Sequence, residues 1–103
     1  MGPIRKIIFH QVDSVIRGHH ASKKCWTPYV GETLTCCRER DNKYDDNAVA
    51  VLKNGKVVGH VPREQSAVFS RLIDRGQKIT ACVTGARRNM GRGLELPCTY
   101  RIF

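Results

Sequence analysis

The sequence has little that would support secretion, a membrane span or a disulfide framework. Its opening residues contain only two adjacent isoleucines and a phenylalanine, too short an apolar run for a signal peptide or a membrane helix. Its five cysteines are an odd number, and reduced thiols are favoured in a chain without a secretory signal. We therefore expect a nuclear protein, or a cytoplasmic one in a prokaryote, that is not secreted and does not dock on membranes.

Zinc-binding patterns are incomplete. Structural zinc usually takes its ligands from paired short spacings such as C-x-x-C. The only close cysteine pair here is Cys36-Cys37, and neighbours in a strand point to opposite faces. His19 and His20 with Cys25 are a possible fragment of a site, but no second pair completes it. The sequence favours no metal, with buried small thiols as the interpretation of the cysteines.

Nucleotide-binding and hydrolytic motifs are also missing. Asp41, Asp45 and Asp46 lack the glycine and the distal glutamate of an EF-hand loop. They suit turn and pairing roles better than metal-assisted hydrolysis, which stays open as a less favoured alternative. No glycine-rich phosphate loop with its lysine is present. We therefore expect no cofactor and no enzymatic activity.

Positive charge is abundant. Eighteen Lys and Arg against nine Asp and Glu give a formal charge of +9, and the basic residues are dispersed along the chain. Such a surface attracts polyanions, and without a basic amphipathic stretch it favours nucleic acid over a membrane. The basic loop GARRNMGRG contributes candidate phosphate contacts, although a solvated hairpin tip explains it equally well: Arg87, Arg88 and Arg92.

Strand patterns dominate the chain. Apolar alternation predicts strands over residues 9–17 and 32–40, with Ile16 and Leu34 on faces opposite to their charged or threonine neighbours. Two β-branched runs flank Asn54-Gly55, a dipeptide typical of a two-residue hairpin turn, so residues 48–61 are expected to form a β-hairpin. Between them, DNKYDDN should be an ordered loop, because Asp and Asn side chains bond neighbouring backbone groups.

One helix is expected after the hairpin. Pro62 suits the first turn, Gly76 supplies a left-handed stop, and Val68, Phe69, Leu72 and Ile73 recur at helical spacing over residues 63–75. Two more strands should follow, at about 78–84 and 95–102. Short strands around one or two helices predict a mainly β fold, a small antiparallel barrel or sandwich.

Aromatic and histidine side chains near loop and strand ends are candidates for stacking on bases. They are His19, His20, Trp26, Tyr29, Tyr44 and His60. For Trp26 and Tyr29 we favour a place in the core instead.

Two motifs resemble the HIRAN domain, known from helicases that remodel replication forks. They are Tyr-Asp-x-Asn-Ala, at residues 44–48, and Val-Gly-His-hydrophobic after the hairpin, at residues 58–61. The similarity covers about residues 11–102, which indicates a domain at 9–103 preceded by an extension at 1–8. The resemblance implies an OB-like β-barrel of about six strands that binds the 3′ end of single-stranded DNA. Partners would be that DNA and a host helicase or other repair proteins.

The resemblance also implies roles for individual residues. The carboxylate of Asp45 would accept a hydrogen bond from the terminal 3′-hydroxyl, and Tyr44 would lie beside the last nucleotide. His60 and Arg63 would meet backbone phosphates, for which the forked guanidinium of arginine is well suited.

One part of the pattern differs. Where the helicase-borne domain has an Arg-Tyr-Tyr run that stacks on bases, this chain has Gly18, His19 and His20. The arginine is displaced to Arg17, which strand alternation places on the other side. The sequence thus predicts capture of single-stranded DNA ends, with a protein-interaction adaptor that lost the DNA pocket as the alternative.

Overall fold

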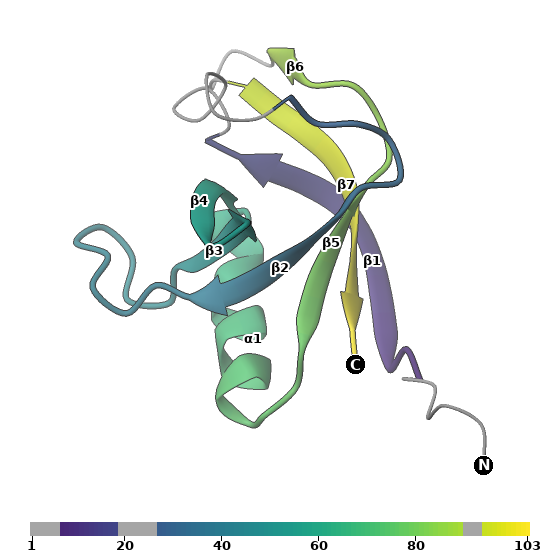
Figure 1. Cartoon of the computed structure of the whole chain (residues 1–103). Coiled ribbons are helices and arrows are strands. Elements are labelled where there is room, and N and C mark those ends of the chain that lie inside the picture. Colours follow the sequence, from purple (N-terminus) through teal and green to yellow (C-terminus); the bar gives the residue numbers. More distant parts are fainter. Residues whose placement is uncertain (1–6, 19–26, 90–93) are drawn as a thin grey trace.

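A computed structural model describes residues 7–18, 27–89 and 94–103 of the chain (Figure 1). The elements are β1 (His10–Arg17), β2 (Thr33–Arg38), β3 (Val49–Lys53), β4 (Lys56–His60), α1 (Arg63–Asp74), β5 (Ile79–Val83), β6 (Arg88–Asn89) and β7 (Leu94–Ile102). The strands pair in the order β1-β4-β3-β2-β5-β7, all antiparallel, and β7 pairs back with β1. Six strands therefore close a barrel, which confirms the predicted OB-like fold, with one helix in the described part.

Alternation along the strands sets the inside of this barrel. Ile16, Leu34 and Cys36 are buried, while their neighbours on β1 and β2 are more exposed, as the sequence predicts. The hairpin turn also matches, because Asn54 and Gly55 both have positive φ, 52° and 79°, which a two-residue type I′ turn requires. The observed strands begin and end within two residues of the predicted positions.

The basic loop after β5 contains a strand that the sequence did not predict. Arg88 and Asn89 form β6, which pairs with Glu95 and Leu94 of β7 outside the closed barrel. A two-residue strand is too short to show alternation, and its pairing depends on where β7 lies. The interpretation of this segment as only a loop was therefore wrong.

Helix α1 has clear signals at both ends. The carbonyl of Pro62, the residue before the helix, accepts hydrogen bonds from the N–H groups of Gln65 and Ser66. At the other end Gly76 has φ 91°, and its N–H and that of Gln77 bond back to the carbonyls of Ile73 and Leu72. This is the Schellman arrangement, which glycine favours because it has no Cβ.

Helix α1 buries Phe69 against the barrel. The ring of Phe69 meets that of Tyr100 edge-on, with centroids 5.2 Å apart. Leu72 and Ile73 pack against the core as partly buried side chains, but Val68 is 55% exposed, contrary to its expected place on the core-facing side. Other core residues come from β3, β4, β5 and β7 and from the position just after β4: Val49, Val51, Val58, Val61, Ile79, Ala81, Val83, Leu96, Cys98 and Ile102.

Two sequence interpretations concern the loop before β2. Tyr29 is 63% exposed and lies under the ammonium of Lys53, whose Nζ is 6.0 Å from the ring centroid, so its expected place in the core was wrong. At the surface, the face of the Tyr29 ring makes a cation–π contact with Lys53. Trp26 lies outside the described residues.

The four described cysteines are free thiols. Cys36 and Cys98 are buried, and burial raises the pKa of both, for Cys98 to about 12. Buried uncharged thiols agree with the interpretation of these residues as small core side chains. Cys25 lies outside the described residues. None of the helical segments that the structure describes has the length and apolar composition needed to cross a membrane.

Gly59 permits the barrel to close between β1 and β4. A side-chain carbon at this position would meet Cγ2 of Ile16 and lie 2.8 Å from the carbonyl oxygen of Arg17. Both contacts are with β1, which joins β4 where Arg17 pairs with His60. The glycine of the Val-Gly-His motif is therefore required by the close approach of two strands.

We predict that Gly59→Ala destabilises the domain by about 1 to 3 kcal/mol, because the added methyl overpacks a closed contact with backbone. Chemical denaturation would measure the change in the free energy of unfolding. Gly85→Ala is the matched control, since a carbon there would lie 3.3 Å from Cγ of Pro97 and the neighbour can give way. Equal effects of the two substitutions would contradict the importance of Gly59 for closure.

Candidate nucleic-acid interface

A depression of about 280 Å³ lies where the end of β1, the β2–β3 loop and the start of α1 meet. Its lining combines charged, polar and aromatic side chains with three buried apolar residues. The lining residues are Arg17, Asn42, Tyr44, Asp45, Ala48, Val49, His60, Val61 and Arg63.

The β2–β3 loop, residues 39–48, is ordered by its own amide and carboxylate groups. Oδ1 of Asn42 accepts hydrogen bonds from the backbone N–H groups of Tyr44, at 2.8 Å, and Asp45, at 3.0 Å. Oδ1 of Asp45 in turn accepts from the N–H of Asn47 at 2.9 Å. These are the local side chain to backbone bonds expected of Asp and Asn, and they confirm the predicted ordered loop.

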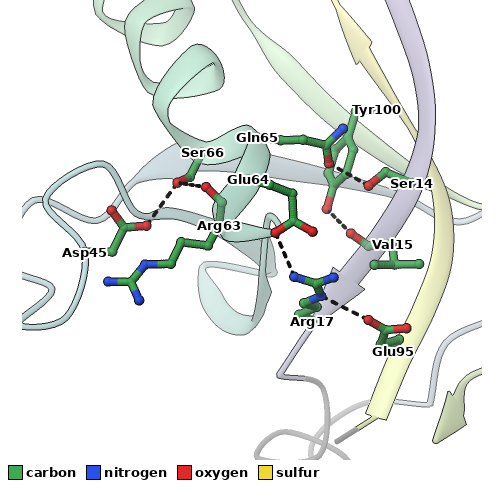
Figure 2. A network of polar contacts seen from close by, with 10 residues as sticks. All are labelled: Ser14, Val15, Arg17, Asp45, Arg63, Glu64, Gln65, Ser66, Glu95 and Tyr100. Atoms are coloured by element: carbon green, nitrogen blue, oxygen red, sulfur yellow. Dashed lines mark hydrogen bonds and ion pairs between the residues drawn. The ribbon is translucent and has the colours of Figure 1, made fainter. Parts of the chain in front are cut away.

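Helix α1 ties this loop to the barrel. The hydroxyl of Ser66 lies 3.0 Å from Oδ2 of Asp45, and the guanidinium of Arg63 donates to the carbonyl oxygen of Tyr44. Figure 2 shows Asp45 of the loop in contact with Ser66 of the helix. The first helical turn therefore fixes the positions of two loop residues that line the depression.

Arg17 lies in the same depression, contrary to the expectation that it faces away. Its Nε donates to Glu95 of β7 at 3.0 Å, and its Nη1 donates to Glu64 of α1 at 2.9 Å (Figure 2). These two hydrogen bonds raise the pKa of Arg17, Glu95 having the larger effect. Arg17 and Glu95 pair across β1 and β7 and therefore lie on the same face of the sheet. At the barrel rim, that face adjoins α1 and the depression.

His60, the end residue of β4, is held by a carboxylate of another strand. Its Nε2 lies 3.0 Å from Oε1 of Glu39, just after β2, and the same oxygen accepts from the side-chain amide of Asn42 at 2.7 Å. The hydrogen bond from Asn42 has the largest effect and lowers the pKa of Glu39; burial opposes it, and the His60 contact lowers the pKa further. Glu39 therefore connects β4 to the loop of Asn42.

The structure brings four of the nine sequence-predicted site residues together: Tyr44, Asp45, His60 and Arg63. Arg87 and Arg88 are exposed near β6 and do not line the depression. The backbone of Arg88 pairs with Glu95, which pairs on its other side with Arg17, so Arg88 lies two strands from the depression. His19, His20 and Arg92 lie outside the described residues.

Sequence reasoning missed two residues that line the depression and a third, Glu39, that contacts two of the lining residues. Arg17 was set aside on strand alternation, and Asn42 and Glu39 were not considered as site residues. The RERDN segment before the Tyr-Asp motif carries the last two, but nothing in it shows that Glu39 reaches His60 across 21 residues of sequence. Among the described residues, no group of three or more His, Cys, Asp or Glu side chains is arranged to hold a metal ion.

The fold and the depression together define a small OB-like β-barrel module with a cationic and aromatic pocket at its rim. The chain belongs to the HIRAN domain family, which matches residues 27–102.

Two solved structures share the fold. The crystal structure of the HIRAN domain of human HLTF superposes with a TM-score of 0.73 at 21% identity, covering 93% of this chain and 77% of that one. A Lactobacillus plantarum protein gives a TM-score of 0.63 at 26% identity, covering 90% and 98% of the two chains. These likenesses show that the shared fold covers 90% or more of this chain.

A curated relative from Arabidopsis thaliana is named as a SWI/SNF-related matrix-associated actin-dependent regulator of chromatin subfamily A member 3-like 1. It is 30% identical over 73 residues, which are 70% of this chain. The chain spans only 8% of that relative's length.

Acid titration should reveal the role of Glu39 in holding the loop. Because its native pKa is lowered, its contribution to stability is present above its ordinary pKa of about 4.5 and is lost as the pH falls through the native value. Glu39→Gln should therefore make the decline of stability below pH 4.5 shallower, as measured by denaturation at a series of pH values. Asp41→Asn, a change at an exposed neighbouring carboxylate, should leave the decline in place. Parallel profiles for wild type and Glu39→Gln would contradict this.

Proposed function

We propose that this domain captures the 3′ end of single-stranded DNA in the depression and acts as a binding module without catalysing a reaction. The observation that carries the proposal is the convergence of Tyr44, Asp45, His60 and Arg63 from a loop, a strand and a helix. Tyr44, Asp45 and His60 belong to the two HIRAN motifs, and Arg63 follows the second motif after Pro62. A positively charged chain with an aromatic at a pocket rim is typical of single-strand binders.

Asp45 is suited to accept the terminal hydroxyl. An ionised carboxylate only accepts hydrogen bonds and has about four lone-pair sites on its two oxygens. Asn47 and Ser66 each contact a different oxygen of Asp45, which fixes the carboxylate and leaves acceptor capacity toward the depression. A 3′-phosphate would bring like charge to this position and offer no comparable donor.

Arg63 and Arg17 are suited to phosphate. Hydrogen bonds within the described residues occupy two of the five N–H donors of Arg17, through Nε and Nη1. Arg88 lies two strand spacings from Arg17, about 10 Å away, on the same side of the sheet. A single-stranded DNA that leaves the pocket over β7 would therefore meet Arg88, one of the predicted loop arginines.

Tyr44 offers a surface for a base. Its side chain is 83% exposed although its backbone is held by Asn42 and Arg63. An exposed aromatic ring on a held backbone can stack on a nucleotide, a contact worth roughly 1 to 3 kcal/mol per base.

The relative named as a chromatin regulator suggests the setting. The chain corresponds to a small part of that protein, so a host helicase or other repair proteins are the partners we propose, in the nucleus, at damaged DNA or stalled forks.

The alternative, a protein-interaction adaptor, has one observation in its favour. Arg17 is already paired with two glutamates, which reduces the positive charge of the pocket.

A 3′-phosphate on a short single strand should weaken binding by about 1 to 3 kcal/mol, the cost of a lost bond and an unpaired buried acceptor. Fluorescence anisotropy with matched oligonucleotides carrying a free or a phosphorylated 3′ end would measure this. Asp45→Asn, which keeps an acceptor oxygen for Asn47, should abolish the discrimination without unfolding the domain. Asp46→Asn is the matched control, and it should preserve the discrimination. Equal affinity of the wild type for both strands would remove end capture, and no affinity for either would favour the adaptor.

Arg63→Ala should weaken binding to all single strands alike and flatten the slope of log K against log salt by roughly 0.7, the value for one phosphate contact on a single strand. Titrations at several salt concentrations would give the slope. Arg71→Ala, an exposed arginine in the last turn of the same helix, removes the same charge away from the pocket. If both variants flatten the slope equally, Arg63 acts only through general charge.

A further inference from the structure

Glu39 contacts the pocket indirectly, through two of the residues that line it. It does not line the depression, yet its Oε1 contacts both His60 and Asn42, which do. Asn42 uses its other end, Oδ1, to hold the backbone of Tyr44 and Asp45. One carboxylate oxygen of Glu39 therefore contacts the histidine proposed to meet phosphate. Through Asn42 the same oxygen is connected to the loop proposed to hold the terminal nucleotide.

The geometry of His60 gives its two ring nitrogens different roles. Nε2 faces Glu39, and an acceptor-only carboxylate requires a proton on that nitrogen. Nδ1 faces Gly18 at the end of β1, where it would lie 4.0 Å from an added side-chain carbon. In the neutral ring with Nε2 protonated, Nδ1 is an acceptor and cannot bind a phosphate oxygen. Only the doubly protonated ring presents an N–H on that side.

We propose that Glu39 is a positioning residue for DNA binding. It holds His60 by Nε2, so that the ring offers phosphate an Nδ1–H only when the ring is positively charged. Through Asn42 it also holds the end-binding loop. The proposal rests on the proposed function of the pocket. It makes affinity for DNA dependent on pH through His60. The charged or titratable groups that face this histidine or share its pocket are Glu39 after β2, Arg17 of β1, Tyr44 and Asp45 of the loop, and Arg63 of α1.

Simple electrostatics and this proposal predict opposite signs for one substitution. Removing a negative charge near a DNA site ordinarily strengthens binding to a polyanion. Glu39→Gln keeps an oxygen that can accept from Asn42, but it no longer favours the charged ring. We expect it to weaken binding about tenfold at pH 6.5, the order of a charge-assisted hydrogen bond. Asp41→Asn, the same change of charge at an exposed neighbour, should leave affinity unchanged or raise it.

A double-mutant cycle separates positioning from a general structural role. The loss caused by Glu39→Gln should disappear in a His60→Gln background, because the interaction that it weakens is already absent. Wild-type affinity should rise between pH 8 and 6, and the part of that rise lost in His60→Gln should also be lost in Glu39→Gln. His19 and His20 can add a further dependence, which both variants would retain. Glu39→Asp, which keeps the charge on a shorter side chain, should restore part of the affinity.

Nitrogen NMR of the His60 ring in the free protein tests the geometry without DNA. At pH 8 the wild type should show its ring proton on Nε2, and Glu39→Ala should give a mixture of tautomers with faster exchange. An unchanged ring spectrum in Glu39→Ala, additive losses in the cycle, or stronger binding by Glu39→Gln would each overturn the proposal. A wild type that does not bind DNA at any pH would instead overturn the proposed function, while the ring spectrum would still decide whether Glu39 positions His60.

Discussion

The close approach of β1 and β4 at Gly59 is the constraint on which the rest of the structure depends. It closes the barrel, because β1 is the strand that also pairs along its full length with β7. It also places Arg17 opposite His60, which brings a guanidinium and an imidazole to the pocket from the two strands. A larger residue at position 59 would separate the strands and, with them, these two side chains. Fold and site are therefore built by the same contact.

The pocket is assembled from segments that are far apart in the sequence and are connected by polar contacts at short range. Helix α1 contacts the β2–β3 loop through Arg63 and Ser66, and β1 through Glu64 and Gln65, which bond Arg17 and Ser14 (Figure 2). These contacts hold the groups of the site before any ligand arrives. Preorganisation of this kind reduces the entropy that binding must overcome.

Local signals in the sequence predicted the fold well, because they depend on near neighbours. Asn54-Gly55 predicted the hairpin, Gly76 the end of the helix, and strand alternation the buried faces. The family motifs predicted four residues that the structure places in one pocket. Arg17, Glu39 and β6 were missed or misplaced, because their surroundings depend on which strands meet and how the barrel rim turns. No local periodicity contains that information.

The charges of the pocket differ from those of the chain as a whole. The chain carries a formal charge of +9, but Arg17 is paired with Glu64 and Glu95, and His60 with Glu39. Overall charge would draw nucleic acid to the surface from any direction, in a manner that salt screens. Inside the pocket these paired side chains favour a ligand whose groups match the available donors and acceptors. On the proposed function, general charge thus supplies the encounter with DNA, while Asp45 and the held side chains of Arg17 and His60 supply the preference for a strand end over the continuous backbone.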